Sequence, residues 1–456
     1  MQLNEKIFKA YDIRGIFGQD FKEDFAYTLG LAYAKMRKQE LESGRKIKVV
    51  VARDMRLSSL SLQKELIRGL LEAGLDVLDI GLSSTPTFYF AVAKLEYDGG
   101  IIVSASHNPA IWNGFKIVRN KALPVGEGTG MEKIKDLILN HQLETSSDKG
   151  LLTKNNEILD LEVKHSLSFS KIENIKPLKV VIDAANAMGA LYCQKLFEQI
   201  PANLISLNFK LDGTFPNHEA DPLKEENLQQ LKEKVISESA DLGIATDGDG
   251  DRVFFVDEKG ESINQAIIRG VLAKIFLREK PGAKIAYDVR PGKITQDLIL
   301  ENGGIPVLSR VGHSLIKAQA IKEDVYFAGE SSGHFFLNMD IGCYEVPMIV
   351  ILKLLEELSN SGLSASDYFK PYKKYYLSGE INLEVESKQA VLDKITETYQ
   401  DGEINLLDGV SVKYQDFWFN VRASNTEEKI RLNLEAVSQE IMETKTKEVL
   451  ELIKNV

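Results

Sequence analysis

Short apolar runs alternate with amphipathic segments along most of the chain, and three stretches repeat one order of elements. Each stretch has a buried strand, a helix, a second strand and a further strand that ends in an unusual polar loop. The predicted strands are 48–54, 76–81 and 101–103, then 179–183, 203–208 and 242–245, then 284–288, 305–308 and 325–328; the predicted helices are 60–73, 191–199 and 295–302. This alternation predicts mostly parallel sheets covered by helices on both faces.

From about residue 371 the pattern changes. An alternating strand at 375–385, a helix at 390–399, a hairpin at 410–422, a strand at 430–436 and a final helix are typical of an α+β domain with an antiparallel sheet. We therefore expect an α/β protein with three similar mixed, mostly parallel domains and a C-terminal α+β domain, arranged around one central cleft. The expected boundaries are 1–154, 155–256, 257–368 and 369–456.

Composition and charge narrow the class of protein. The chain has 456 residues, of which 44% are hydrophobic and 27% charged, and this favours several globular domains over a disordered or fibrous protein. The net charge of −11 argues against a nucleic-acid partner. Cys193 and Cys343 lack metal-binding spacing, which favours buried thiols in a reducing compartment. With no signal peptide or apolar span, we expect a cytoplasmic monomer or weak oligomer without a membrane partner.

The turn at 104–109 contains the candidate nucleophile. The apolar run 100–103 predicts a short buried strand that delivers Ser106 into a turn made by His107, Asn108 and Pro109. A serine hydroxyl alone is a weak nucleophile. Because neighbouring side chains on an extended segment point to opposite faces, we do not expect His107 to activate Ser106 by sequence adjacency alone.

An acidic loop follows the strand at 242–245. Asp247, Asp249 and Asp251 alternate with glycines. Three carboxylates this close together repel one another unless a cation lies between them, and because all their ligand atoms are oxygens they indicate a site for Mg²⁺ or Ca²⁺. An EF-hand is the main rival, because Glu258 falls at the twelfth position of such a loop. However, Arg252 stands where the EF-hand needs glycine, and 253–256 has the pattern of a strand rather than of the exiting helix. A solvated acidic turn is the other alternative.

The remaining polar loops are weaker signals when taken singly. Glu330 and Ser332 follow the strand at 325–328 and offer a carboxylate and a hydroxyl for sugar hydroxyls. The segment 422–426 lies at a turn between strands and could hold a phosphate. In open α/β sheets ligands bind at the carboxyl ends of strands, so loops at equivalent places in three similar domains are expected to serve one site.

Together these loops resemble the α-D-phosphohexomutase family, and within it the bacterial phosphomannomutase/phosphoglucomutase branch. The resemblance covers nearly the whole chain in the family's order, and the Ser106 and triple-aspartate motifs together are highly specific. The matching segments are 10–15, 106–109, 113–116, 247–252, 312–314, 329–334 and 422–426.

The resemblance implies a role for each matching residue. Ser106 matches the serine that carries the phosphoryl group, and Ser106 with Asp247, Asp249 and Asp251 matches the ligand set of one Mg²⁺. Glu330 and Ser332 match the pair that binds the sugar 3- and 4-hydroxyls. Further matches place Arg14, Lys116 and His334 with the catalytic groups, and Tyr11, Arg252, His313, Arg422, Ser424, Asn425 and Thr426 with the substrate-binding groups.

The activity implied by the resemblance is reversible phosphoryl transfer between the 1- and 6-positions of a mannose or glucose phosphate. It proceeds through phosphoserine and a hexose 1,6-bisphosphate, which also acts as the activator. Phosphoglucosamine mutase is an alternative, although Gly250 and Ser331 differ from the alanine and glutamine usual in that branch. A non-catalytic sugar-phosphate-binding or Ca²⁺-binding relative is the alternative from another class, but binding alone would not require both Ser106 and the three aspartates.

Overall fold

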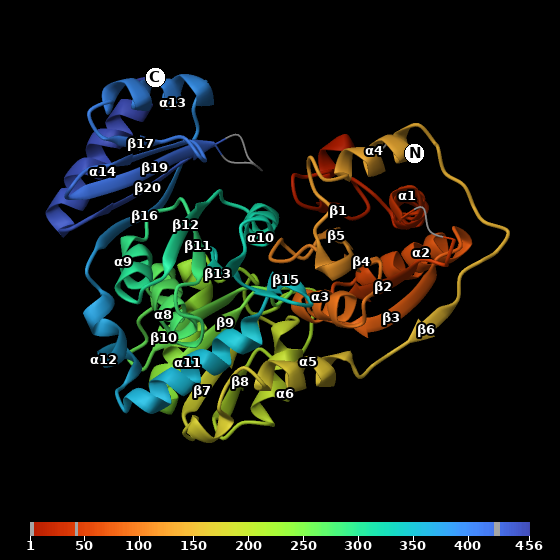
Figure 1. The fold of residues 1–456 in the computed structure, drawn as a ribbon, viewed down its shortest axis with the longest axis horizontal. Helices are drawn as coiled ribbons and strands as arrows, with labels where there is room; N and C mark the ends of the chain where they lie inside the picture. Colours follow the sequence, from red (N-terminus) through yellow and green to blue (C-terminus); the bar gives the residue numbers. More distant parts are fainter. Residues whose placement is uncertain (1–3, 42–43, 424–428) are drawn as a thin grey trace. The chain divides into compact units, whose positions relative to one another are not determined.

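The computed structural model describes residues 4–41, 44–423 and 429–456 (Figure 1). The chain forms two compact units. Unit 1 comprises Met1–Ser262 and His334–Ala365, and unit 2 comprises Ile263–Gly333 and Ser366–Val456. The boundaries of the four expected domains stay predictions.

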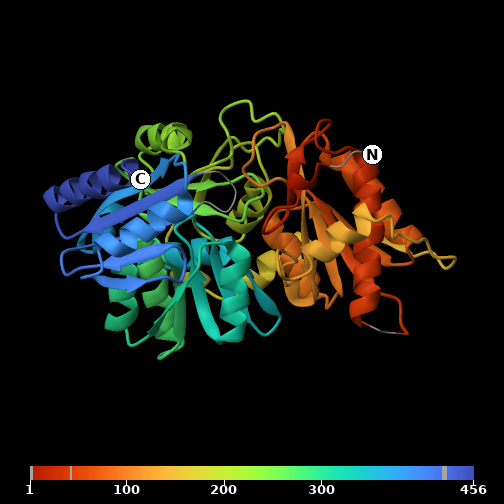
Figure 2. The ribbon, with the colours of Figure 1, turned by 90° about the horizontal axis from the view of Figure 1, so that it is seen from above.

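The first sheet of unit 1 has the strand order β1-β5-β4-β2-β3-β6. Strands β4, β2, β3 and β6 run parallel, and β1 and β5 are antiparallel to their neighbours. Helices α1 and α2 lie side by side against this sheet (Figures 1 and 2). The bounds are β1 Ile13–Ile16, β2 Lys48–Arg53, β3 Asp76–Leu82, β4 Gly99–Val103, β5 Trp112–Arg119, β6 Leu152–Lys154, α1 Glu23–Leu41, α2 Ser59–Glu72, α3 Thr85–Lys94, α4 Met131–Leu139 and α5 Ile158–Leu167.

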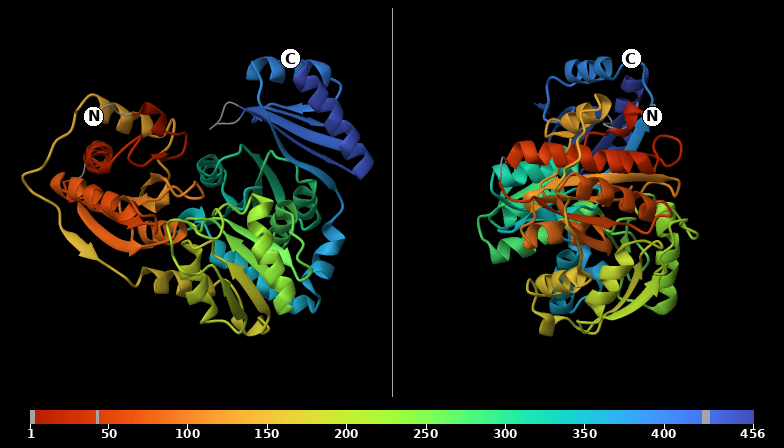
Figure 3. Two further views of the ribbon diagram at one scale, coloured as in Figure 1. Left: turned by 180° about the vertical axis from the view of Figure 1, so that it is seen from behind. Right: turned by 90° about the vertical axis from the view of Figure 1, so that its right-hand side faces the viewer.

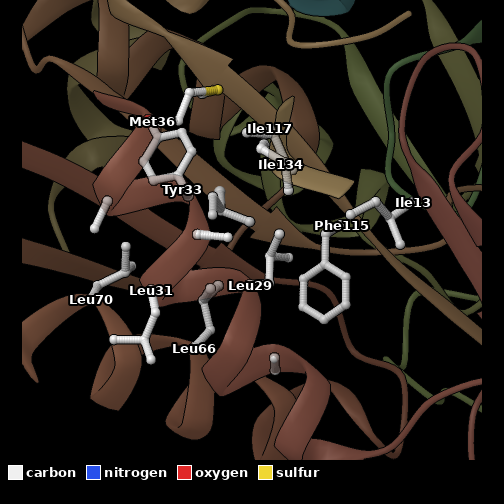
Figure 4. Close-up of a cluster of buried hydrophobic side chains, with 14 of the residues drawn as sticks. Ile13, Leu29, Leu31, Tyr33, Met36, Leu66, Leu70, Phe115, Ile117 and Ile134 are labelled. Atoms are coloured by element: carbon white, nitrogen blue, oxygen red, sulfur yellow. The ribbon is translucent and has the colours of Figure 1, made fainter. Parts of the chain in front are cut away.

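The largest described core packs α1, α2 and α4 against one face of this sheet. Alternate strand residues such as Val49 and Val51 point into it, while their neighbour Val50 is buried on the opposite face. Figure 4 shows the centre of the cluster, where Phe115 of β5 and Ile13 of β1 lie beside Leu29 of α1. Burial on both faces explains why these strands consist of nearly continuous apolar residues.

The second sheet of unit 1 has the order β10-β9-β7-β8, with β10 antiparallel and the other strands parallel. Helix α7 packs against β7 and β9, and α11 packs against α5 and α6. The hairpin β14–β15 and helix α11 return to this unit after the chain has built part of unit 2. The bounds are β7 Lys179–Asp183, β8 Asn203–Leu207, β9 Leu242–Thr246, β10 Val253–Asp257, β14 Phe335–Met339, β15 Gly342–Glu345, α6 Gly189–Phe197, α7 Gln229–Glu238 and α11 Pro347–Ser361.

Unit 2 contains a parallel group of strands in the order β12-β11-β13, against which α8, α9 and α10 pack. It also contains a five-stranded antiparallel sheet in the order β16-β20-β19-β18-β17, with α13 and α14 on one face (Figure 3, left). The bounds are α8 Gln265–Glu279, β11 Lys284–Asp288, α9 Lys293–Glu301, β12 Ile305–Ser309, α10 His313–Lys322, β13 Val325–Gly329, α12 Ala365–Phe369, β16 Tyr376–Leu383, α13 Lys388–Thr398, β17 Glu403–Asn405, β18 Val410–Lys413, β19 Phe417–Ala423, β20 Ile430–Ala436 and α14 Gln439–Lys454.

The predicted α/β fold class is confirmed, and so is the change to an antiparallel α+β domain near the C-terminus. The expected arrangement of the domains around one central cleft stays a prediction. Both cysteines are buried free thiols, as expected. Among the described residues, no helix combines the length and the apolar character needed to cross a membrane.

Candidate active site

Ser106 lies in the turn after β4 and is 1% exposed. Its φ of 50° is in the left-handed region, which non-glycine residues seldom adopt. The Ser106 Oγ donates a hydrogen bond to Asp247 Oδ2 at 3.1 Å and lies 3.2 Å from His107 Nδ1. The expectation that the adjacent histidine would point away is therefore wrong, because it assumed an extended backbone and the left-handed turn brings the two side chains together.

Local hydrogen bonds fix the shape of this turn. The Ser106 N–H donates to Ser104 Oγ at 3.0 Å. Arg14, on β1, donates from Nη1 to the Ala105 carbonyl at 3.3 Å and to Asn108 Oδ1 at 2.7 Å. The same guanidinium pairs with Asp12 at 2.7 Å, so its orientation is fixed beside the Ser106 turn.

The acidic loop follows β9 and its backbone curls around Asp247. The Asp247 Oδ1 accepts hydrogen bonds from the backbone N–H groups of Asp251 at 3.1 Å and Arg252 at 3.2 Å. Gly250 has a φ of 74°, which glycine adopts without strain. The strand β10 begins at Val253 and pairs with β9, so the helix that an EF-hand requires is replaced by a strand.

The three carboxylates fit a divalent cation. One oxygen of each of Asp247, Asp249 and Asp251 lies within 4.8 Å of the others, and all three residues are buried. Asp249 Oδ1 is buried without a hydrogen-bond partner in the described structure. Burial, together with the charges of Asp251 and Asp249, raises the pKa of Asp247 well above its usual value. Clustered oxygen donors with an unsatisfied lone pair are what Mg²⁺ binds.

Lys116, on β5, partly neutralises this cluster. Its Nζ lies 2.6 Å from Asp249 Oδ2 and 2.6 Å from Asp251 Oδ2, and the side chain is 4% exposed. Burial opposes the charge of Lys116, but the two carboxylates outweigh it and raise its pKa well above the usual value. Lys116 is therefore a buried, permanently charged ammonium group beside the acidic loop.

Thr85 is a site residue that the sequence pattern did not single out. It is the first residue of α3, and its Oγ1 donates to Asp249 Oδ2 at 2.6 Å while its N–H donates to the Asp249 carbonyl at 2.9 Å. The start of the helix thereby holds one carboxylate of the acidic loop, where the helix dipole also favours negative charge. The Ser-Ser-Thr-Pro segment at 83–86 has the composition of a helix start, but nothing in it points to residue 249.

Two further expected residues complete the cluster in unit 1. His334 Nε2 lies 3.2 Å from Asp251 Oδ1 and 3.4 Å from Arg252 Nε. Arg252 Nε also lies 3.7 Å from Asp247 Oδ2.

The imidazole of His107, beside Ser106, is neutral at pH 7. Burial and the charges of Arg252 and Arg14 lower the pKa of His107 well below its usual value.

The expected sugar-binding residues lie in unit 2. Glu330 follows β13, and its Oε1 accepts from the Gly312 N–H at 2.8 Å, while its Oε2 accepts from Ser332 Oγ at 3.3 Å. Ser331, between them, donates its N–H to Asp288 Oδ2 at 2.6 Å. Burial alone would raise the pKa of Asp288, but two arginines, Arg290 and Arg269, hold it well below its usual value. This loop is thus anchored to an ionised carboxylate at the end of β11.

The structure places the other expected residues as follows. Arg422, on β19, is 2% exposed and donates from Nη2 to Glu380 Oε2 at 3.1 Å. His313 begins α10 in unit 2, and Tyr11 is half-buried in the bend before β1 in unit 1. Ser424, Asn425 and Thr426 lie outside the described residues.

Comparisons with known proteins show which family the whole chain is similar to. Domains I, II and III of phosphoglucomutase/phosphomannomutase match residues 5–145, 162–260 and 264–375, and the C-terminal domain matches 380–452. Phosphomannomutases from Methanocaldococcus jannaschii and Escherichia coli are 37% and 38% identical over 98% of this chain, covering 97% and 99% of their own length. A crystal structure of a phosphoglucomutase/phosphomannomutase family protein from Burkholderia thailandensis superposes with a TM-score of 0.87 at 32% identity, covering 99% of this chain and 98% of the other. This chain belongs to the phosphoglucomutase/phosphomannomutase family.

Proposed function

We propose that this protein is a phosphohexomutase that moves a phosphoryl group between the 1- and 6-positions of a mannose or glucose phosphate, with Ser106 as the carrier. One observation supports this assignment most strongly. The Ser106 hydroxyl lies 3.1 Å from Asp247, the first of three buried aspartates that each offer a carboxylate oxygen within 4.8 Å of the others. A serine beside a cluster of carboxylates is poorly suited to acyl chemistry and well suited to carrying a phosphoryl group next to a metal ion.

Mg²⁺ fits the oxygen donors of Asp247, Asp249 and Asp251, with Ser106 beside them, and when bound it would neutralise charge on the phosphoryl oxygens. A phosphoserine carries about −1.5 to −2 charges at pH 7. With three aspartates it exceeds the charge of one divalent ion. Lys116, Arg14 and Arg252 supply the remaining positive charge in the same unit.

The transfer proceeds in two balanced steps. Phosphorylated Ser106 passes its group to O6 of a hexose 1-phosphate, so that the Oγ–P bond breaks, the O6–P bond forms and the proton of O6 is transferred to Ser106 Oγ. The resulting hexose 1,6-bisphosphate rotates in the site, which exchanges the positions of its two phosphates. Ser106 Oγ then takes the phosphoryl group from O1, the proton of Oγ is transferred to O1, and the hexose 6-phosphate is released. Added bisphosphate acts as activator because it phosphorylates any Ser106 that has lost its group.

Both orientations of the sugar must be accepted by the same groups. The 3- and 4-hydroxyls exchange places when the sugar rotates in the site, so Glu330 and Ser332 can bind this pair of hydroxyls in either orientation. The 2-hydroxyl, at which glucose and mannose differ, is not needed for this contact. Arg422 and its neighbours Ser424, Asn425 and Thr426 are assigned to the phosphate that is not transferred, while Tyr11, His313 and His334 are assigned to further contacts with the substrate and its reacting groups.

The test compares mannose 1-phosphate, glucose 1-phosphate and glucosamine 1-phosphate as substrates, with Mg²⁺ and a trace of glucose 1,6-bisphosphate. We expect comparable turnover of the first two and loss of turnover in Ser106→Ala. Preference for the glucosamine substrate would move the protein to the phosphoglucosamine mutase activity. Substantial turnover by Ser106→Ala would contradict the carrier assignment, and binding of all three sugars without turnover would identify a non-catalytic relative.

A further inference from the structure

Arg56 is a buried arginine in the segment between β2 and α2, and its side chain has 0% exposure. Its guanidinium donates to four backbone carbonyl oxygens of the segment that contains Ser106. Nη2 donates to Ser106 O at 2.8 Å and Asn108 O at 2.6 Å, and Nη1 donates to Pro109 O at 2.8 Å and Trp112 O at 3.0 Å. We propose that Arg56 is a positioning residue that holds the Ser106 turn in the conformation needed for phosphoryl transfer.

The turn needs such support because its backbone is strained. A non-glycine residue in the left-handed region costs on the order of 1–3 kcal/mol, and it persists only where the surroundings enforce it. Ser106 has a φ of 50°. The backbone torsions of the turn determine both the direction of the Ser106 carbonyl and the direction of the Cα–Cβ bond that carries Oγ, so a donor fixed to that carbonyl restricts where the side chain starts.

Arg56 is itself held rigidly from three sides. The Arg56 Nε lies 3.2 Å from Asp54 Oδ2, and the backbone N–H of Arg56 donates to Asp54 Oδ1 at 3.0 Å. The Phe215 ring lies with its centroid 5.0 Å from the guanidinium carbon. Gly213 packs so closely that a Cβ there would lie 2.7 Å from the Arg56 Cα. The guanidinium is therefore pre-organised before any substrate binds.

The chemistry of the side chain explains why arginine is required. A planar guanidinium presents its donors in a fixed fork, whereas a lysine ammonium is a compact point charge on a flexible stem. The four carbonyls spread over residues 106–112 need that fork. The partners of Arg56 are backbone carbonyls and Asp54 rather than reacting atoms, so its effect on the reaction passes through Ser106.

This inference rests on the proposed function, in which Ser106 is the carrier. The test distinguishes a failure of that function from a failure of the positioning role of Arg56. Arg56→Lys is compared with Arg53→Lys, a matched control on β2 whose guanidinium donates to the Asp54 carbonyl at 3.2 Å. We expect kcat of Arg56→Lys to fall on the order of 30- to 100-fold while KM for the hexose 1-phosphate and the Mg²⁺ requirement stay within about twofold of the wild type. Amide hydrogen exchange in residues 104–112 should accelerate at least tenfold in Arg56→Lys and stay unchanged in Arg53→Lys.

The proposal is overturned if kcat of Arg56→Lys stays within threefold of the wild type, or if KM rises in step with the fall in kcat. It is also overturned if Arg53→Lys loses the same activity. If Arg56→Lys does not fold, Phe215→Leu, which keeps the guanidinium and removes its aromatic support, should lower kcat about 3- to 10-fold, and an unchanged kcat would overturn the proposal. If the wild type has no turnover, the proposed function fails, and the exchange rates alone then decide whether Arg56 fixes the turn.

Discussion

The backbone of Gly248 lies directly against the carbonyl of Ser106, so that a Cβ at position 248 would be 2.2 Å from the Ser106 oxygen. The two residues belong to loops of different sheets, one after β4 and one after β9. Their contact leaves no room for a side chain at position 248. The Ser106 turn and the acidic loop therefore pack backbone against backbone, and we expect this contact to influence the distance from Ser106 Oγ to the carboxylates.

Gly248→Ala should therefore damage the site more than the fold. The new methyl group must displace the Ser106 carbonyl, which we expect to lower kcat on the order of 100-fold and to reduce the free energy of unfolding by about 1–3 kcal/mol. Steady-state kinetics and urea unfolding measure both quantities. Gly44→Ala, at an exposed glycine where an added Cβ meets no atom of the described residues within 4 Å beyond its chain neighbours, is the control and should leave both unchanged. Wild-type kinetics in Gly248→Ala would show that the contact does not set the geometry.

Thr85→Val should weaken Mg²⁺ binding. The Thr85 hydroxyl orients Asp249 by a hydrogen bond of 2.6 Å to Oδ2, and without it that oxygen keeps its contact with Lys116 but is held less firmly. We expect the Mg²⁺ concentration for half-maximal activity to rise about tenfold, in the range found when an outer partner of a metal ligand is removed. Thr85→Ser keeps the hydroxyl and should stay close to the wild type. An equal loss in the serine variant would mean that the methyl group, not the hydrogen bond, matters.

Lys116→Met should make folding depend on Mg²⁺. Removing the ammonium leaves Asp249 and Asp251 buried without their cation, which we expect to cost about 3–5 kcal/mol in the presence of EDTA. Saturating Mg²⁺ should restore most of that loss, because the metal supplies positive charge to the same oxygens. Thermal unfolding with EDTA and with Mg²⁺ measures the effect. Lys64→Met, at an exposed position on α2, should show no such dependence; a deficit in Lys116→Met that Mg²⁺ leaves untouched would contradict the charge argument.

Glu435, on β20 in unit 2, should make the stability of that unit pH-dependent. It is fully buried, and its Oε2 accepts from Trp418 Nε1 at 2.6 Å and from the Lys293 N–H at 2.9 Å at the start of α9. Burial raises the pKa of Glu435 to about 7 from an ordinary 4.5. The folded protein therefore binds more protons than the unfolded chain between these pH values, and its stability falls as pH rises through that range, by about 3 kcal/mol for this group.

Glu435→Gln keeps the acceptor oxygen and removes the titration. We expect the variant to be less sensitive to pH between 5 and 8 than the wild type, and more stable than the wild type at pH 8. Urea unfolding across this range, followed by the fluorescence of Trp112 and Trp418, measures the difference in the free energy of unfolding. Parallel pH curves for the two proteins would show that Glu435 does not titrate there.

The sequence was most informative where local patterns decide structure. Buried strands such as β4 and β9 consist almost entirely of apolar residues and glycine, and each ends at the loop from which a candidate residue was predicted. Helix α1 was not predicted, since residues 29–34 are consecutively buried between α2, α4 and the sheet and the helix therefore has no clear polar stripe.

Side chains whose role depends on distant partners were less predictable. Thr85 and Asp249 are 164 residues apart, and Arg56 reaches Ser106 across 50 residues. No periodicity in the sequence encodes such contacts. The prediction that the side chains of Ser106 and His107 lie on opposite faces was wrong for a different reason. A single left-handed residue changes the geometry of adjacent side chains, and non-local contacts hold that residue in the left-handed conformation.

Unit 1 is discontinuous, because its last segment, His334–Ala365, follows the first strands of unit 2. Ser106 and Asp247 are separated by 141 residues. At a synthesis rate of about 5–20 residues per second, a nascent chain carries the serine for roughly seven to thirty seconds before the acidic loop leaves the ribosome. His334 and α11 follow later still. The growing polypeptide thus carries Ser106 without its partner Asp247 throughout this interval, and the buried cluster around Ser106 is complete only after His334 has been synthesised.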